Sequence, residues 1–166
     1  MASVSELEVT TFSIDDTQYP FDLAKHAAIN KGDLNSEFAE HSAVFAFYAT
    51  AFELAKEHEA RCKAEKEATY AKADIWVRNQ ANNAEKKLTE KMVENMAMIQ
   101  QEYIDAQNKH ITAARNVGLL KAAVDALSTK KDMLISLGAM IRAEGDSTIS
   151  INKKLENAKS IMKGHV

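Results

Sequence analysis

From residue 33 to residue 117 the chain contains neither glycine nor proline, the two residues that most often interrupt regular structure. The whole sequence of 166 residues has only five glycines and one proline, and it is rich in alanine, glutamate and lysine. This composition favours long helices. We therefore predict an all-α protein whose long helices pack lengthwise, as in a helical hairpin or bundle.

Apolar side chains recur every seven residues in the first part of this segment. One row is formed by Phe38, Phe45 and Phe52, and its companion row by His41, Tyr48, Ala55, Cys62, Thr69 and Trp76. Spacings of three and four alternate between the rows, which places both on one face of a helix. The pattern predicts a first helix that begins near residues 33–36 and runs to about Asn79. The polar stretch NQANNAEKK, at 79–87, is the expected break.

Two further helical stretches are expected. The first carries Met92, Met96, Ile99 and Tyr103, and the second carries a longer apolar row, namely Val117, Leu120, Val124, Leu127, Leu134 and Ile141. Gly118 and Gly138 lie inside the second stretch, where close packing against another helix would explain small residues. Gly145 is expected to end this helix, and one of the next three residues to cap a short amphipathic one. That last helix either docks on a neighbouring subunit or forms a frayed basic tail.

The beginning of the chain has a different pattern. The alternating stretch VTTFSIDD, followed by TQYPFDL, predicts either a short strand pair that turns at Asp15–Asp16 or a mobile arm. The chain is therefore divided into an N-terminal arm with at most weak β structure (1–32), a helical core (33–145) and a basic amphipathic tail (146–166).

Several features indicate a protein of the cytoplasm, which would be the host cytoplasm if the protein is viral. No run of 18 apolar residues is present, and the start MASVSELEV lacks the basic and apolar regions of a secretory signal. The single cysteine, Cys62, fits a reducing compartment. Because it lies on the apolar row, it is expected to be a small buried residue.

Charge is distributed unevenly along the chain. Residues 1–59 contain 3 Lys/Arg and 11 Asp/Glu, a net charge of −8, whereas residues 60–166 contain 18 and 13, a net charge of +5; together they give −3. Either an anionic partner meets the later part of the chain, or both parts are solvated helix faces.

Motifs of enzymes and cofactor sites are missing. Helical di-metal proteins use Glu-x-x-His pairs, but the residues three before His41, His58 and His110 are phenylalanine, alanine and glutamine. Neither GxxxxGK[ST] nor GxGxxG occurs. We therefore expect a protein without catalytic activity, metal or cofactor.

The stretch YAKADIWVRNQ, at 70–80, combines the chain's only tryptophan with basic residues. On a helix Lys72 and Trp76 share a face, Arg61 lies almost on the same line, and Tyr70 lies on the opposite side with Lys63 and Lys66. Rings interleaved with cations suit single-stranded nucleic acid, because bases stack on rings while cations contact phosphates. The other interpretation is that Trp76 belongs to the apolar core.

Two segments resemble the UvsY-type phage recombination mediators. AKADIW (71–76) is similar to that family's helix motif Ala-Arg-Leu-Asp-Tyr-Tyr, and AAVDALSTKKDMLISLGAMIRAE (122–144) is similar to its closing helix. Order and spacing match across about 38–76 and about 88–144. The family's basic pair falls on Tyr70 and Lys72, of which only Lys72 keeps the charge, with Lys66 or Arg78 as possible substitutes.

The resemblance implies a small helical protein that forms ring-shaped oligomers, binds single-stranded DNA and helps a RecA-like recombinase replace a single-strand-binding protein. The expected DNA-binding residues are Arg61, Lys63, Lys66, Tyr70, Lys72 and Arg78, with Tyr70 as the stacking ring. We also expect a homo-oligomer larger than a dimer, with the apolar row of 117–141 at its contacts. The alternative is a structural or scaffolding helical oligomer, such as a phage assembly component, without a nucleic-acid role.

Overall fold

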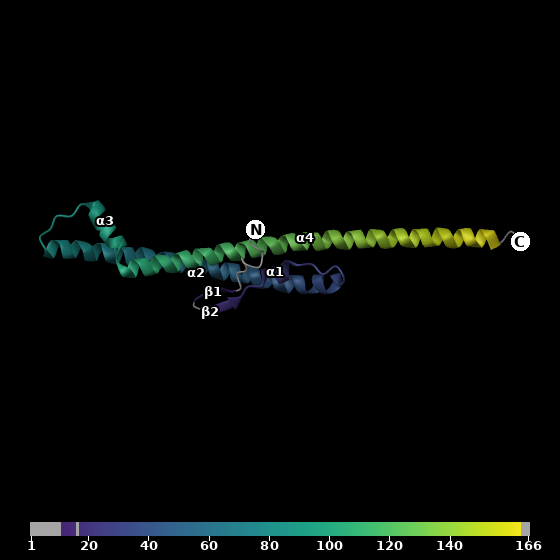
Figure 1. Cartoon of the computed structure of the whole chain (residues 1–166), viewed down its shortest axis with the longest axis horizontal. Helices are drawn as coiled ribbons and strands as arrows, with labels where there is room; N and C mark the ends of the chain where they lie inside the picture. The colour runs from purple at the N-terminus through teal and green to yellow at the C-terminus, as the bar shows by residue number, and fades with distance from the viewer. Residues whose placement is uncertain (1–10, 16, 164–166) are drawn as a thin grey trace, which may run out of the picture.

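The computed structural model describes residues 11–15 and 17–163. Two long antiparallel helices dominate the molecule and lie side by side over much of their length (Figure 1). The elements, in chain order, are β1 (Thr11–Ile14), β2 (Thr17–Pro20), α1 (Leu23–Ala27), α2 (Leu34–Asn83), α3 (Glu90–Met98) and α4 (Gln101–Lys163). The prediction of an all-α fold of long helices packed lengthwise, with a short β arm, is confirmed.

The limits of α2 follow from its capping residues. The Asp33 carboxylate accepts a hydrogen bond from the Ser36 backbone N–H at 3.1 Å, which satisfies one of the free donors of the first turn. At the other end Glu85 adopts a left-handed conformation with φ of 54°, and the backbone leaves the helix. The predicted start near 33–36 is correct, and the predicted end near Asn79 is four residues short.

A short helix and a break connect the two long helices. The Thr89 hydroxyl caps α3 by accepting a hydrogen bond from the Met92 N–H at 3.3 Å. Residues 99 and 100 then separate α3 from α4, so the chain turns twice before α4 runs back along α2. The break predicted in the polar stretch 79–87 is therefore present.

The core lies between α2 and α4. Leu120, Leu127 and Leu134 of α4 are buried at intervals of seven residues, as the third apolar row predicts. Many other core positions are alanines, which let the helix axes approach closely. The buried alanines are Ala51, Ala55 and Ala73 of α2, Ala97 of α3, and Ala106, Ala113 and Ala123 of α4.

The N-terminal arm is part of this core. Strands β1 and β2 pair antiparallel, with Ile14 opposite Thr17, and Asp15 in the turn has a φ of 47°. Phe12 and Ile14 are buried against both long helices. The Asn116 side chain also donates a hydrogen bond to the Ser13 carbonyl oxygen at 2.7 Å. The strand-pair alternative is therefore correct, whereas α1 was not predicted; residues 1–10 lie outside the described residues.

The expected helix end at Gly145 is wrong, because α4 continues through it to Lys163. One glycine disfavours a helix by only about 1 kcal/mol, and it does not end α4 although the stretch after it, DSTIS, is poor in strong helix formers. The prediction of close packing also fails at Gly118, where a Cβ atom would contact nothing within 4 Å. At Gly138 a Cβ atom would lie 3.5 Å from the Phe38 ring of α2, an ordinary van der Waals contact.

None of the helices in the described part of the chain is both long and apolar enough to cross a membrane.

Candidate nucleic-acid interface

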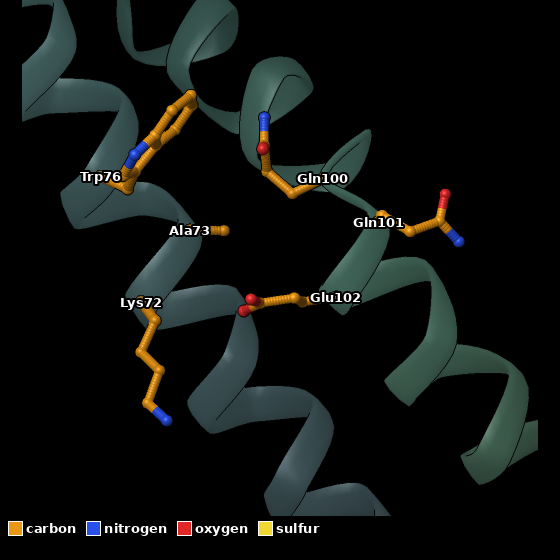
Figure 2. A pocket seen from close by; sticks show the side chains of 6 residues that line it. All are labelled: Lys72, Ala73, Trp76, Gln100, Gln101 and Glu102. Carbon is orange, nitrogen blue, oxygen red and sulfur yellow. The ribbon is translucent and has the colours of Figure 1, made fainter.

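The predicted basic and aromatic segment borders a hollow between α2 and the start of α4. The hollow has a volume of about 430 Å³ and is lined by Lys72, Ala73, Trp76, Gln100, Gln101 and Glu102. Figure 2 shows the Trp76 indole and the Lys72 side chain leaving α2 in different directions, while the Glu102 carboxylate reaches toward α2 from the facing helix. We call this hollow the Trp76 groove.

Trp76 is half exposed, at 50% of its maximal accessible surface, so the interpretation that it belongs to the core is wrong. Ala73 and Val77 occupy the core positions beside it. A straight α-helix has 3.6 residues per turn, so a strict seven-residue row drifts by about 20° per heptad. The row that is buried at Ala55 and Cys62 has therefore rotated away from α4 when it reaches Trp76.

The polar groups of the Trp76 groove are of mixed charge. Lys72 is exposed and forms no ion pair with any described residue. The Gln100 amide donates to the Met96 carbonyl oxygen at 2.9 Å, and the Gln101 amide to the Asp105 carboxylate at 2.8 Å. Because Glu102 adds a carboxylate, the groove offers one ammonium group and one negative charge rather than a strongly positive surface.

Arg78 and Arg61, both predicted to contact DNA, are held in ion pairs within the fold. The Arg78 guanidinium lies 2.6 Å from Glu90 of α3 and 2.8 Å from Asp74. These bonds, first that to Glu90, raise the pKa of Arg78, and the same contact lowers the pKa of Glu90. Arg61 contacts Asp15 in the turn of the strand pair and lies 3.7 Å from Glu57. Both arginines thus connect elements of the fold.

The other three predicted residues lie away from the groove. The Tyr70 ring packs edge-on against Tyr103 of α4, with ring centroids 5.7 Å apart, and is half-buried. Lys63 is exposed and Lys66 is half-buried, and neither forms an ion pair with a described residue. The structure therefore brings Lys72 and Trp76 to one site and leaves Lys63, Lys66 and Tyr70 elsewhere on the helix.

Sequence reasoning missed Gln100, Gln101 and Glu102. These residues follow Trp76 by more than twenty positions, and only the break between α3 and α4 brings them to the groove. The polar pair Gln100–Gln101 is the sign of this break in the sequence. The sign is weak, because glutamine is also well tolerated inside long helices.

The predicted oligomer-contact row is divided between core and surface. Leu120, Leu127 and Leu134 are buried between α2 and α4 of one chain, so they are core residues and not free surface. Val117 and Val124 are half-buried around the same core. Ile141 is the member of the row that is exposed.

Cys62 is buried, as the sequence predicts, and it lies at the end of a polar chain. The Asp15 carboxylate is 2.7 Å from His58 Nδ1, and His58 Nε2 is 3.6 Å from Cys62 Sγ. The thiol is only 5% exposed, and burial raises its pKa, the opposite of what activates a cysteine nucleophile. Among the described residues, no group of three or more His, Cys, Asp or Glu is placed to hold a metal ion.

Comparison of the chain with protein-family models, with curated proteins and with solved structures finds no match.

Proposed function

We propose that this protein binds single-stranded DNA through the Trp76 groove and acts without catalysis as a recombination mediator. In this role it helps a RecA-like recombinase replace a single-strand-binding protein on the DNA. The observation that supports DNA binding is the half-exposed Trp76 ring beside Lys72, which has no ion pair with a described residue. The mediator role and its protein partners rest on the resemblance of AKADIW and of residues 122–144 to the UvsY-type family.

The proposed contact assigns different roles to the two side chains. An exposed indole offers a flat face on which any base can stack, and a nearby ammonium group can neutralise the phosphate of a neighbouring nucleotide. Lys63 and Lys66 lie on α2 away from the groove, so they add positive charge to the helix without a defined contact in this proposal. Tyr70 is a poorer stacking partner than the sequence indicates, because Tyr103 already covers part of its ring. Arg61 and Arg78 contribute less, because carboxylates already neutralise them.

The chain's single tryptophan makes the proposal directly measurable. Titration with oligo-dT should quench or shift the emission of Trp76 in proportion to the DNA bound. A Trp76→Ala variant, followed by anisotropy of labelled oligo-dT, should lose about 1–3 kcal/mol of binding free energy. Ile75→Ala truncates an exposed neighbour that is not among the residues lining the groove, so it serves as the matched control.

The cation is tested by the dependence of affinity on salt. Lys72→Ala should lower the slope of log affinity against log salt by roughly 0.7, the value for one phosphate contact on a single strand. Lys121→Ala removes an exposed lysine of α4 that has no ion pair with a described residue, and should leave the slope unchanged. If Trp76→Ala and Lys72→Ala, both folded, bind oligo-dT as the wild type does, the proposed DNA contact is wrong.

A structural or scaffolding helical oligomer is the second candidate. It is favoured by the apolar side chains that α4 exposes beyond the two-helix core, among them Ile141, Ile149 and Leu155. Both candidates include a homo-oligomer larger than a dimer. Titration with oligo-dT at two salt concentrations separates them, since a DNA-binding mediator loses affinity as salt rises, whereas a scaffold would not bind the DNA.

A further inference from the structure

The Trp76 groove contains a carboxylate, which contacts to phosphate groups do not explain. Glu102 lines the groove from the first turn of α4, and its side chain is exposed. It forms neither a hydrogen bond nor an ion pair with any described residue. A free carboxylate repels phosphate, so it weakens the binding of a strand that offers only its backbone at this position.

The indole of Trp76 and the carboxylate of Glu102 border the same hollow from two facing helices. Ala73 precedes Trp76 by three residues on the same face of α2, and Figure 2 shows its single methyl group between the other two side chains. The volume of about 430 Å³ lies within the range of about 300–1,000 Å³ that is usual for sites of small molecules. A base that stacks on Trp76 can therefore extend over Ala73 and bring its edge toward the Glu102 carboxylate.

The wall of the groove on the side of α4 presents mainly hydrogen-bond acceptors. The Gln100 amide nitrogen already donates to the Met96 carbonyl oxygen at 2.9 Å, and the Gln101 amide nitrogen to the Asp105 carboxylate at 2.8 Å. The two amide oxygens have no partner among the described residues. The ionised carboxylate of Glu102 has two acceptor oxygens and no donor. This wall therefore favours a base whose edge donates hydrogen bonds.

Guanine matches such a wall better than the other three bases do. Its Watson–Crick edge carries two adjacent donors, N1–H and the N2 amino group, which the two oxygens of one carboxylate can accept in parallel. Adenine and cytosine each offer one amino group beside a ring nitrogen that accepts. Thymine has a single N–H between two carbonyl oxygens, which a carboxylate repels. The expected order of affinity is therefore guanine first, adenine and cytosine next, and thymine last.

We propose that the Trp76 groove binds guanine in preference to thymine, and that Glu102 determines this specificity. The base enters the groove, while the phosphate stays outside near Lys72, whose side chain leaves α2 in a different direction from Trp76 (Figure 2). The inference rests on the proposed function, because it names the base that the single strand presents at this site. It adds a preference among sequences, which contacts to the phosphate backbone alone do not produce.

Competition between oligonucleotides measures the preference among bases. Unlabelled thymine octamers, unchanged or with guanine, adenine or cytosine at two non-adjacent positions, compete with labelled oligo-dT for the wild-type protein, followed by anisotropy. The guanine octamer should bind roughly tenfold more tightly than the unchanged one, the factor that one charge-assisted hydrogen bond supplies. An octamer with hypoxanthine in place of guanine lacks the N2 amino group and should lose most of this advantage. Because hypoxanthine is also a purine, this comparison separates hydrogen bonding from stacking.

The Glu102→Gln variant tests the residue. The amide keeps the shape of the side chain, removes its charge and replaces one acceptor oxygen with a donor. The variant should bind the guanine octamer more weakly than the wild type does, and the unchanged thymine octamer more tightly, because the negative charge no longer repels the strand. The matched control is Glu67→Gln, which removes an exposed carboxylate of α2 that does not line the groove. It should leave the order of the octamers unchanged.

A structural role of Glu102 is distinguishable by the direction of the changes. A carboxylate in the first turn stabilises a helix, because the helix dipole is positive there, whether or not DNA is bound. If Glu102 had only this role, Glu102→Gln would lower the thermal stability and change the affinities for all octamers in the same direction. Opposite changes for guanine and thymine are expected only from contact with the base.

Three outcomes would overturn the proposal. The first is equal affinity of the wild type for all octamers. If Trp76→Ala and Lys72→Ala still weaken binding in that case, the proposed DNA contact stands and only the specificity is wrong. The second is a guanine preference that Glu102→Gln or hypoxanthine leaves intact, which would assign the preference to stacking or to another residue. The third is a wild type that binds none of the octamers, which would contradict the proposed function as well.

Discussion

The two parts of the apolar row on α4 have the same sequence character and opposite environments. In the part that runs beside α2, Leu120, Leu127 and Leu134 are at most 1% exposed. In residues 141–163 of α4, which run on past α2 and which we call the overhang, Ile141 and Leu155 lie on the same row with Thr148 between them, and both are about half exposed. Helix formation is equal in both parts, so the difference arises only from the presence of a neighbouring helix.

This comparison separates what forms a helix from what stabilises a fold. Residues of the first part contribute to one cooperative core together with Tyr48 and Phe12. Residues of the overhang contribute little until a partner covers them, since burial of apolar surface is the main source of stability. Substitutions at equivalent positions of the two parts should therefore have different consequences.

The largest expected difference is between two leucines. Leu127→Ala should lower the free energy of unfolding by about 2–5 kcal/mol, because it leaves a cavity in a closely packed core. Leu155→Ala should change it by less than about 0.5 kcal/mol in the monomer. Urea denaturation at a concentration below self-association measures both. Equal losses would mean that the overhang is covered within the single chain.

A buried ion pair gives the next largest effect. Lys130 is buried, and its ammonium lies 2.6 Å from the Glu37 carboxylate and 2.9 Å from the His26 carbonyl oxygen. Lys130→Met should lower the free energy of unfolding by about 2–3 kcal/mol, because it removes the partner of a largely buried carboxylate. Lys131→Met, at an exposed neighbouring position, should have almost no effect. An equal response of the two variants would contradict the structure.

The ion pair between Lys130 and Glu37 also predicts that the free energy of unfolding depends on pH. The hydrogen bond from Lys130, followed by that from the Asn30 N–H, lowers the pKa of Glu37 below its ordinary value of 4.5. Stability from a lowered carboxyl pKa is present above the ordinary value and is lost as the pH falls through the folded-state pKa. The stability difference between the wild type and Lys130→Met should therefore be constant near neutral pH and narrow below about pH 4.5.

The smallest expected effects come from replacing two glycines, Gly118 and Gly145, with alanine. A Cβ atom at Gly118, beside α2, or at Gly145, in the overhang, would meet nothing within 4 Å. Gly118→Ala should raise the free energy of unfolding by about 0.5–1 kcal/mol, since alanine favours the helix without a clash. Gly145→Ala should increase the helical signal in circular dichroism without moving the cooperative transition. If Gly145→Ala shifts the cooperative unfolding transition, the overhang unfolds together with the core.

At the candidate site, the sequence indicated a segment but not which of its residues share one surface. The basic and aromatic segment was found from its composition, but its six predicted contact residues do not form one surface. Arg61 and Arg78 are paired with Asp15 and Glu90, which come from other elements. No local pattern shows such pairs, because their members are 46 and 12 residues apart in the chain.

The sequence by itself determined the helical class, the start of α2 near residues 33–36 and the seven-residue rows, and it offered the strand pair that turns near Asp15 as one of two alternatives. Each of these depends on interactions within one or two turns, or on side-chain periodicity along one element. Only the tertiary structure decided that Trp76 faces solvent, that Gln100 lies near it, and that the apolar row on α4 extends beyond the part of α4 that packs against α2. These features depend on which helix packs against each segment, and that helix can be tens of residues away in the sequence. Burial and ion pairing are set by neighbours in space and not by neighbours in the chain.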